Sequence, residues 1–160
     1  TMLAKRNLTY FQVLARQGNL KVTPKQHVTK IHMALDEGQL VGVRETTDYA
    51  MEQEGKVVGL TRGLIWLLAE PKGQGIGSLL LDDLIETANG VEALSLNVTQ
   101  NNAGAQRLYR SRGFEYCCTQ PEQSYQLVPN YLLIKPLTAL GAKTLRAERK
   151  KARSQGTYSK

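Results

Sequence analysis

Glycines alternate with other residues in one short stretch of the chain, Lys72-Gly73-Gln74-Gly75-Ile76-Gly77-Ser78. An apolar run over residues 64–68 precedes it, and residues 79–88, with apolar side chains at helical spacing, follow it. Glycine lets the backbone approach a ligand without an intervening Cβ. The first N–H groups of a helix lack intrahelical acceptors, and the helix dipole favours an anion there. The stretch therefore predicts a strand, a turn and a helix N-terminus that bind a diphosphate.

Two common phosphate-binding patterns do not fit these glycines. A Walker A loop needs a lysine and then Ser or Thr after its last glycine, and no lysine follows Gly77. A dinucleotide-binding loop needs Gly-x-Gly-x-x-Gly, but Ser78 stands where the third glycine should be. That loop also requires an acidic residue at the end of the next strand, and the sequence offers no clear one.

A third pattern fits, and a second motif supports it. The stretch from Lys72 to Gly77 resembles Arg/Gln-x-x-Gly-x-Gly/Ala, the acetyl-CoA pyrophosphate loop of the GNAT N-acetyltransferase superfamily, with Lys in the first position. The stretch from Asn102 to Glu115 resembles the second signature of that superfamily, Asn-x-x-Ala-x-x-Leu-Tyr followed after three residues by Gly-Phe. The resemblance covers residues 49–137.

The resemblance implies a fold and a function. The fold class would be α/β (α+β), with a mixed, mostly antiparallel central sheet flanked by helices and splayed at the cofactor site. Residues 1–137 would form an acetyl-CoA-dependent N-acetyltransferase domain, and residues 138–160 a basic, helical or flexible tail. The acceptor would be a primary amine, on a protein lysine or N-terminus or on a small molecule, attacking directly in a ternary complex. The alternative is a GNAT-fold binding module with little or no catalysis.

The same resemblance assigns residues to the coenzyme. The backbone at the end of the preceding strand would hold the pantetheine arm, and an N–H there would polarise the thioester carbonyl. The loop and the first helical residues would cup the diphosphate, and Asn102, a predicted helix cap, would contact the pantetheine. The predicted cofactor-binding residues are Leu67, Leu68, Ala69, Lys72, Gln74, Gly75, Gly77, Ser78 and Asn102. The connection from Ala69 to Lys72 is shorter than is usual in the family.

Tyr109 is the predicted catalytic residue. It occupies the position of the tyrosine that protonates the leaving thiolate in many relatives, and the pKa values of a phenol and a thiol lie within about two units of each other. The general base stays open. The candidates are Glu70, Glu52, Glu54, His32 and a water molecule.

The spacing of apolar residues predicts the elements that position these residues. Two helices are expected in the N-terminal region, one from Thr9 to Arg16 and one that begins at Thr23 and Pro24 and ends at Gly38. The later elements are predicted as a hairpin of strands 49–53 and 56–60 around Glu54-Gly55, a strand at 64–68 covered on both faces, helix 79–88, strand 93–98, helix 103–112 with Gly113 as its left-handed stop, and strands 114–118 and 131–134.

Length and composition limit the number of domains and the possible membrane spans, disulfides and metal sites. The chain has 160 residues, which indicates one domain, and no apolar run reaches the ~18 residues of a membrane span. Cys117 and Cys118 are neighbours, so a disulfide between them is not expected, and two thiols without a histidine pattern do not predict a metal site. Two reduced thiols are typical of a cytoplasmic protein. The sequence leaves monomer and homodimer open.

Positive charge gathers at the C-terminal end. Of the net charge of +7, residues 141–160 contribute +6, from seven Lys and Arg residues against Glu148. These residues favour a helix over 142–153, and we expect it to be solvated because no apolar stripe is evident. Residues 143–153 are the predicted contact for nucleic acid or an acidic protein.

Overall fold

The computed structural model describes residues 8–15, 29–70, 72–73, 75–120 and 128–158. They form two compact units. The first comprises the described residues within 1–58 and 62–89, and the second comprises those within 59–61 and 90–160. No helix within the described ranges is long and apolar enough to cross a membrane.

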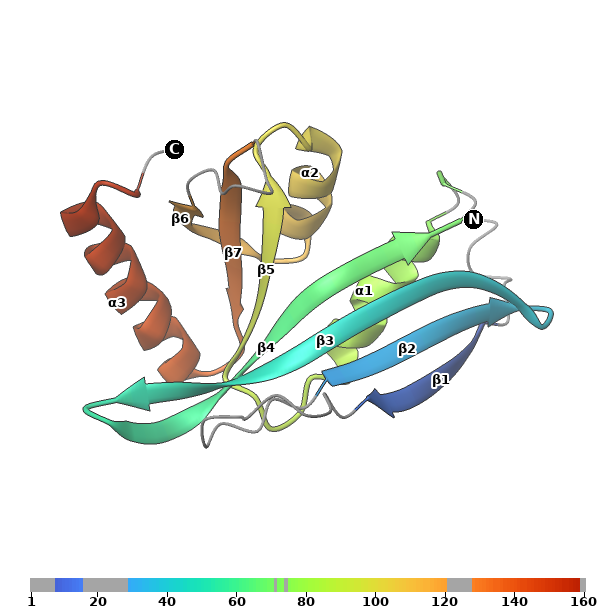
Figure 1. The fold of residues 1–160 in the computed structure, drawn as a ribbon, viewed down its shortest axis with the longest axis horizontal. Coiled ribbons are helices and arrows are strands. Elements are labelled where there is room, and N and C mark those ends of the chain that lie inside the picture. The colour runs from blue at the N-terminus through green and yellow to red at the C-terminus, as the bar shows by residue number, and fades with distance from the viewer. Residues whose placement is uncertain (1–7, 16–28, 71, 74, 121–127, 159–160) are drawn as a thin grey trace. The chain divides into compact units, whose positions relative to one another are not determined.

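The first unit holds a sheet in the order β1-β2-β3-β4 and one helix. The strands are β1 (Leu8–Ala15), β2 (Thr29–Asp36), β3 (Gln39–Gln53) and β4 (Lys56–Ala69), and the helix is α1 (Ile76–Glu86). β2 pairs antiparallel with both β1 and β3. Figure 1 shows the four strands in blue to green.

The two predicted N-terminal helices are wrong where the structure describes them. Residues 8–15 are β1 and residues 29–36 are β2; Thr23 and Pro24 lie outside the described residues. Apolar residues in β2 also alternate, at Ile31, Met33 and Leu35, which fits a strand as well as a helix. Gly38 does not end a helix. With Glu37 it makes a two-residue turn at positive φ, 50° and 80°, that joins β2 to β3.

The hairpin at Glu54-Gly55 is confirmed, with φ values of 51° and 77°. Its strands are longer than predicted, because β4 continues through the apolar run at 64–68. The expectation that this run is covered on both faces is wrong. Leu64 is buried, but Ile65, Trp66 and Leu68 are 43%, 57% and 59% exposed.

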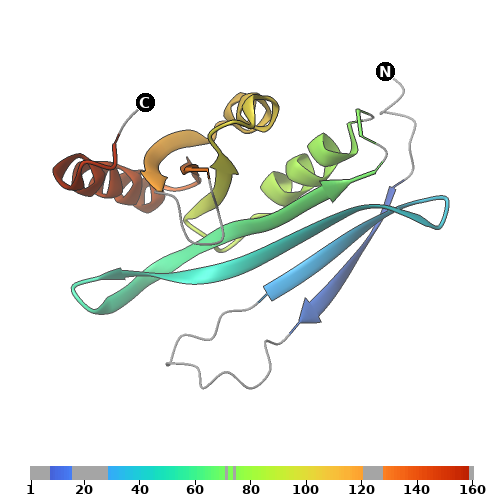
Figure 2. The ribbon, with the colours of Figure 1, turned by 45° about the horizontal axis from the view of Figure 1, so that its top comes forward.

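Helix α1 covers one face of this sheet (Figure 2). Its Ile76 and Leu80 are buried against Ala34 of β2, with Leu67 and Ala69 packed beside them. A Cβ on Gly42 of β3 would lie 2.6 Å from Leu80 Cδ1, so the glycine is what lets the helix approach the strand. The predicted helix over 79–88 is thus confirmed, with its start three residues earlier.

The second unit holds strands β5 (Ala93–Thr99), β6 (Glu115–Gln120) and β7 (Asn130–Pro136), with helices α2 (Ala103–Ser111) and α3 (Ala139–Gln155). β7 pairs antiparallel with both β5 and β6. These elements confirm the predicted strands and helix, including Asn102 as the cap of α2 and Gly113 at φ 88°. Cys117 and Cys118 are free thiols, as expected. The mixed, mostly antiparallel fold class is confirmed; the splay at the cofactor site stays a prediction.

Helix α3 is packed, not solvated. Leu145 is 3% exposed and lies in a cluster with Ala93, Cys117 and Ile134. Thr138 caps the helix by accepting a hydrogen bond from the N–H of Gly141 at 3.1 Å. The expectation of no apolar stripe is wrong because Gly141, Leu145 and Ala152, spaced four and seven residues apart, make one narrow buried face.

Candidate functional site

The glycine loop opens α1 as the sequence predicts. Gly73 and Gly75 have φ values of 80° and 74°, in the left-handed region that glycine adopts without strain. Gly75 is the N-cap, and its carbonyl accepts from the N–H of Leu79 at 3.1 Å. The N–H groups of Ile76, Gly77 and Ser78 belong to the first turn, so they lack intrahelical acceptors. Gln74, also predicted to bind the diphosphate, lies outside the described residues.

Gly77 is a glycine that the fold itself does not require. It lies in α1 without a positive φ, and a Cβ built on it meets no atom within 4 Å. Glycine in a helix interior costs about 1 kcal/mol relative to alanine. Internal packing therefore does not explain this residue, whereas close approach of a ligand to the helix N-terminus would.

The end of β4 leads into this loop. Leu68 is exposed, while Leu67 and Ala69 are half-buried against the cluster under α1. The N–H of Glu70 donates to the carbonyl of Val41 at 2.9 Å, so ladder hydrogen bonding to β3 reaches one residue beyond β4. Lys72 is exposed. The predicted residues from Leu67 to Ser78 that the structure describes thus lie along one strand end, the loop after it and one helix start within the first unit.

Asn102 and Tyr109 belong to the second unit and lie on one helix. Asn102 Oδ1 accepts from the N–H of Ala105 at 3.1 Å, which confirms its role as cap of α2. Tyr109 follows seven residues later, and residues at this spacing share a face of a helix. Gln106 ties α2 to the end of β5 by donating to the carbonyls of Thr99 and Gln100 at 3.1 and 2.9 Å.

The environment of Tyr109 is partly apolar. Its ring packs edge-on against Phe114, with 5.9 Å between the ring centroids. Burial raises the pKa of the Tyr109 phenol above 10.0. The phenol therefore stays protonated at every ordinary pH, but it is a weaker acid than a free tyrosine.

The candidate bases differ in setting. Glu52 and Glu54 are exposed beside the β3–β4 turn, and Glu70 is exposed directly after β4. His32 lies on β2, not on a helix. Burial, and then the charge of Arg44, lowers the pKa of His32 below 6.5, so its imidazole is neutral at pH 7.

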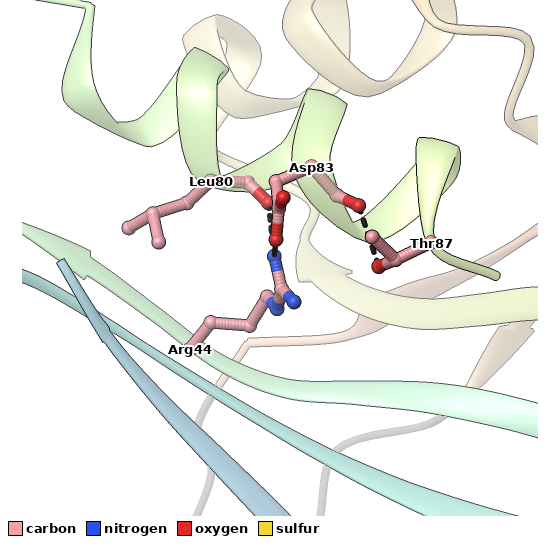
Figure 3. Close-up of polar contacts among 4 residues, drawn as sticks. All are labelled: Arg44, Leu80, Asp83 and Thr87. Carbon is pink, nitrogen blue, oxygen red and sulfur yellow. Dashed lines mark hydrogen bonds and ion pairs between the residues drawn. The ribbon is translucent and has the colours of Figure 1, made fainter. Parts of the chain in front are cut away.

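The sequence interpretation missed a polar cluster in the first unit, on the α1 side of the sheet. Arg44 of β3 is 1% exposed, and its Nη1 donates to the carbonyl of Leu80 at 2.7 Å and to Asp83 Oδ2 at 2.9 Å (Figure 3). Thr87 donates to the carbonyl of Asp83 at 2.7 Å. The alternation of Gly42, Arg44 and Thr46 with Val41 and Val43 is the signal that could have identified this strand.

The family model of the acetyltransferase (GNAT) family matches residues 9–114, about two thirds of the chain. The chain belongs to this family. Membership makes it an acyltransferase of the GNAT N-acetyltransferase type, with acetyl-CoA as co-substrate. A search of curated proteins gives no significant match.

Solved structures of GNAT acetyltransferases share the fold. Arabidopsis thaliana NAA60 in complex with acetyl-CoA is 17% identical, with a TM-score of 0.57 over 68% of this chain and 76% of that one. The ribosomal-protein-S18-alanine N-acetyltransferase of Escherichia coli is 23% identical, with a TM-score of 0.55 over 68% of each chain. The ribosomal-protein-alanine N-acetyltransferase of Brucella melitensis is 28% identical, with a TM-score of 0.55 over 68% of this chain and 69% of that one.

Proposed function

We propose that this GNAT enzyme acetylates a primary amine of a protein or peptide, such as its N-terminal amine, by direct attack on acetyl-CoA in a ternary complex. The observation that carries the coenzyme's position is Gly77. It stands in the first turn of α1 with open space where its Cβ would lie, two residues after the left-handed N-cap glycine, Gly75. A diphosphate at this point would accept from the N–H groups of the first turn and gain from the helix dipole.

The other residues proposed for the coenzyme lie at the end of β4, at the start of α1 and, in the second unit, at the cap of α2. The backbone of Leu67 to Ala69 would carry the pantetheine arm, with Lys72 and the Ser78 hydroxyl adding a charge and a donor at the diphosphate. The Oδ1 atom of Asn102 is engaged in capping α2, so its side-chain amide would be the group that donates to the pantetheine.

Protons must move in two places. The acceptor amine must be neutral before it attacks, and the leaving thiolate must gain a proton. The phenol of Tyr109 holds that proton at all relevant pH values. Of the four side chains considered as base, Glu70 stands next to Ala69 in the chain, so we propose that Glu70, directly or through water, takes the proton of the amine.

The proposal of a protein or peptide acceptor draws on the Brucella melitensis relative, the most similar of the three structures compared, which is named as a ribosomal-protein-alanine N-acetyltransferase. The test is acetyl transfer from labelled acetyl-CoA to peptides with a free N-terminus, to the same peptides with a blocked N-terminus and one lysine, and to small amines. Transfer to small amines alone would overturn this choice of acceptor.

Two substitutions of Gly77 test the coenzyme site. Gly77→Ala places a methyl group in open space, so the free protein should keep its stability or gain about 1 kcal/mol, while affinity for acetyl-CoA falls. Gly77→Glu adds a charge where the diphosphate would sit, so binding measured by calorimetry should be lost. Ala147→Glu, an exposed position on α3, adds the same charge and should leave binding unchanged. Unchanged affinity in a folded Gly77→Glu protein would refute the site.

A second contact surface is proposed on α3. Lys143, Arg146 and Lys150 are exposed and spaced three and four residues apart, so they share one face of the helix, away from buried Leu145. Such a row of cations suits the phosphates of a nucleic acid. This contact would act beside acetyl transfer and would not replace it.

A further inference from the structure

A polar cavity of about 290 Å³ lies in the first unit, between the sheet and the second half of α1. Its lining comes from three strands and the helix: Lys30, His32, Arg44, Thr46, Arg62, Asp83, Leu84 and Thr87. The lining begins on α1 at Asp83, six residues or about 9 Å along the helix from Gly77. The cavity is therefore separate from the glycine loop, although both use α1.

Two buried nitrogen atoms in this lining have no hydrogen-bond partner among the described residues: Arg44 Nε and His32 Nδ1. Arg44 is 99% buried, and among the described residues its Nη1 donates to the carbonyl of Leu80 and to Asp83, whereas its Nε has no partner (Figure 3). Buried donors in native proteins are almost always satisfied, and leaving one unpaired costs about 1–3 kcal/mol. The unpaired atoms therefore indicate that the cavity takes an acceptor from outside the described residues.

The charges of the lining residues indicate which kind of acceptor the cavity would bind. Arg62 is already paired, since it donates to both oxygens of Asp48 at 2.8 and 3.2 Å, and Arg44 is paired with Asp83. Lys30 has no ion-pair partner within the part of the chain that the structure describes, so the cavity carries an excess positive charge. The lowered pKa of His32 agrees, because after burial itself its causes include Arg44, Lys30 and Arg62, opposed by Asp83.

We propose that this cavity binds a small molecule through a phosphate or carboxylate group, at a site distinct from that of the coenzyme. The anionic oxygens would accept from Arg44 Nε, from the ring N–H of His32 and from Lys30 Nζ. Charge-assisted bonds of this kind are short and strong, and a phosphate or carboxylate has enough lone pairs to serve all three donors. The site does not rest on the acetyl-transfer proposal, since none of its lining residues has a role there.

The first experiment is an NMR titration of the full chain with inorganic phosphate and, separately, with malonate, at constant ionic strength set by chloride. It uses the Gly77→Glu variant, so that the glycine loop is closed to anions. Saturable shifts of the amide signals of His32, Thr46 and Thr87 support the site, and the stronger of the two ligands identifies the group it prefers. Shifts confined to residues 76–78, or equal shifts with chloride alone, would overturn it.

The second experiment compares charge-matched variants. Lys30→Gln removes a charge that has no ion-pair partner among the described residues, and it should weaken binding of the preferred anion roughly tenfold, which corresponds to one lost charge-assisted hydrogen bond. Lys56→Gln removes an exposed charge at the far end of β4 and should leave the dissociation constant unchanged. Arg44→Lys keeps the charge but lacks Nε, and should weaken binding if it folds. Equal affinity in wild type and Lys30→Gln, or equal losses in both Gln variants, would refute the site.

Discussion

Gly141 of α3 lies so close to the backbone of Glu92 that a Cβ built on it would come within 2.0 Å of the Glu92 carbonyl oxygen. The same carbonyl accepts from the N–H groups of Leu137 and Thr138 at 2.9 and 3.3 Å, and the Thr138 hydroxyl bonds to the Glu92 carboxylate. The backbone of Glu92 therefore fixes where α3 begins, and the absence of a side chain at Gly141 makes this contact possible.

Gly141→Ala should destabilise the protein, because the oxygen it meets is backbone and cannot rotate away. We expect a loss of about 3 kcal/mol, the upper range for overpacking, measured by urea unfolding. Gly104→Ala is the control. Gly104 lies in α2, and its Cβ would meet only Arg107 Nη2 at 3.9 Å, so alanine should be neutral or stabilising there. If Gly141→Ala left the free energy of unfolding unchanged, the start of α3 would not be packed against Glu92.

Tyr109→Phe should lower kcat by about 10²-fold if the phenol protonates the leaving thiolate, with little change in acetyl-CoA affinity. The sign of its pH dependence follows from burial. An acid donates only while protonated, and burial raises the pKa of Tyr109 above 10.0. Rates should therefore show no alkaline decline from this group up to about pH 10. Lost stability with unchanged kcat would instead make Tyr109 a packing residue beside Phe114.

Removal of either partner of the Arg44–Asp83 ion pair should have unequal effects, because Arg44 is 1% exposed and Asp83 is 26% exposed. Asp83→Ala leaves a buried guanidinium without its carboxylate and should cost about 3 kcal/mol or more. Arg44→Met leaves a carboxylate that reaches water and should cost about 1–2 kcal/mol.

The Arg62–Asp48 pair is the control for this asymmetry. For the variants of both pairs, the free energy of unfolding is measured by urea denaturation. Its side chains are 12% and 15% exposed, so Arg62→Met and Asp48→Ala should differ far less from each other. If Arg44→Met and Asp83→Ala lowered the free energy of unfolding equally, burial of the remaining charge would not determine the cost of breaking the ion pair.

Nucleic-acid binding by α3, if it occurs, should weaken with salt. Each cation that neutralises a DNA phosphate contributes about 0.9 to the slope of log K against log salt. Replacing Lys143, Arg146 and Lys150 together by Gln should therefore lower the slope by about 2–3, measured by fluorescence anisotropy. Gln at the exposed positions Lys56, Arg107 and Arg110 removes the same charge elsewhere. An equal effect of both triple variants would assign binding to net charge and not to this face.

Two turns of the same type show what the sequence could and could not predict. Glu37-Gly38 and Glu54-Gly55 have nearly the same φ values, yet only the second was predicted as a hairpin. Apolar residues before Glu37 fit helical spacing as well as alternation, so local pattern could not decide. Strand pairing decided it: β2 forms ladders with both β1 and β3, and only tertiary structure supplies those partners.

In the candidate site, too, the features that depend on local sequence were predictable and those that depend on distant residues were not. The glycine loop, the Asn102 cap and the Gly113 stop depend on residues a few positions apart, and the structure has all three as predicted. The burial of Arg44 depends on Asp83, 39 residues away in the chain, and on a glycine in β3 that admits α1. The polar cavity is built from such long-range neighbours, so no local motif predicted it.

Trp66 is the only tryptophan in the chain, and its side chain is 57% exposed on β4, one residue before the strand end proposed to carry the pantetheine arm. The protein therefore has a single indole fluorophore beside its seven tyrosines, and the indole emission should be that of an indole in water. A ligand or peptide that covers this part of β4 would shift the emission to shorter wavelength. Binding of coenzyme and acceptor can thus be followed in solution without attaching a label.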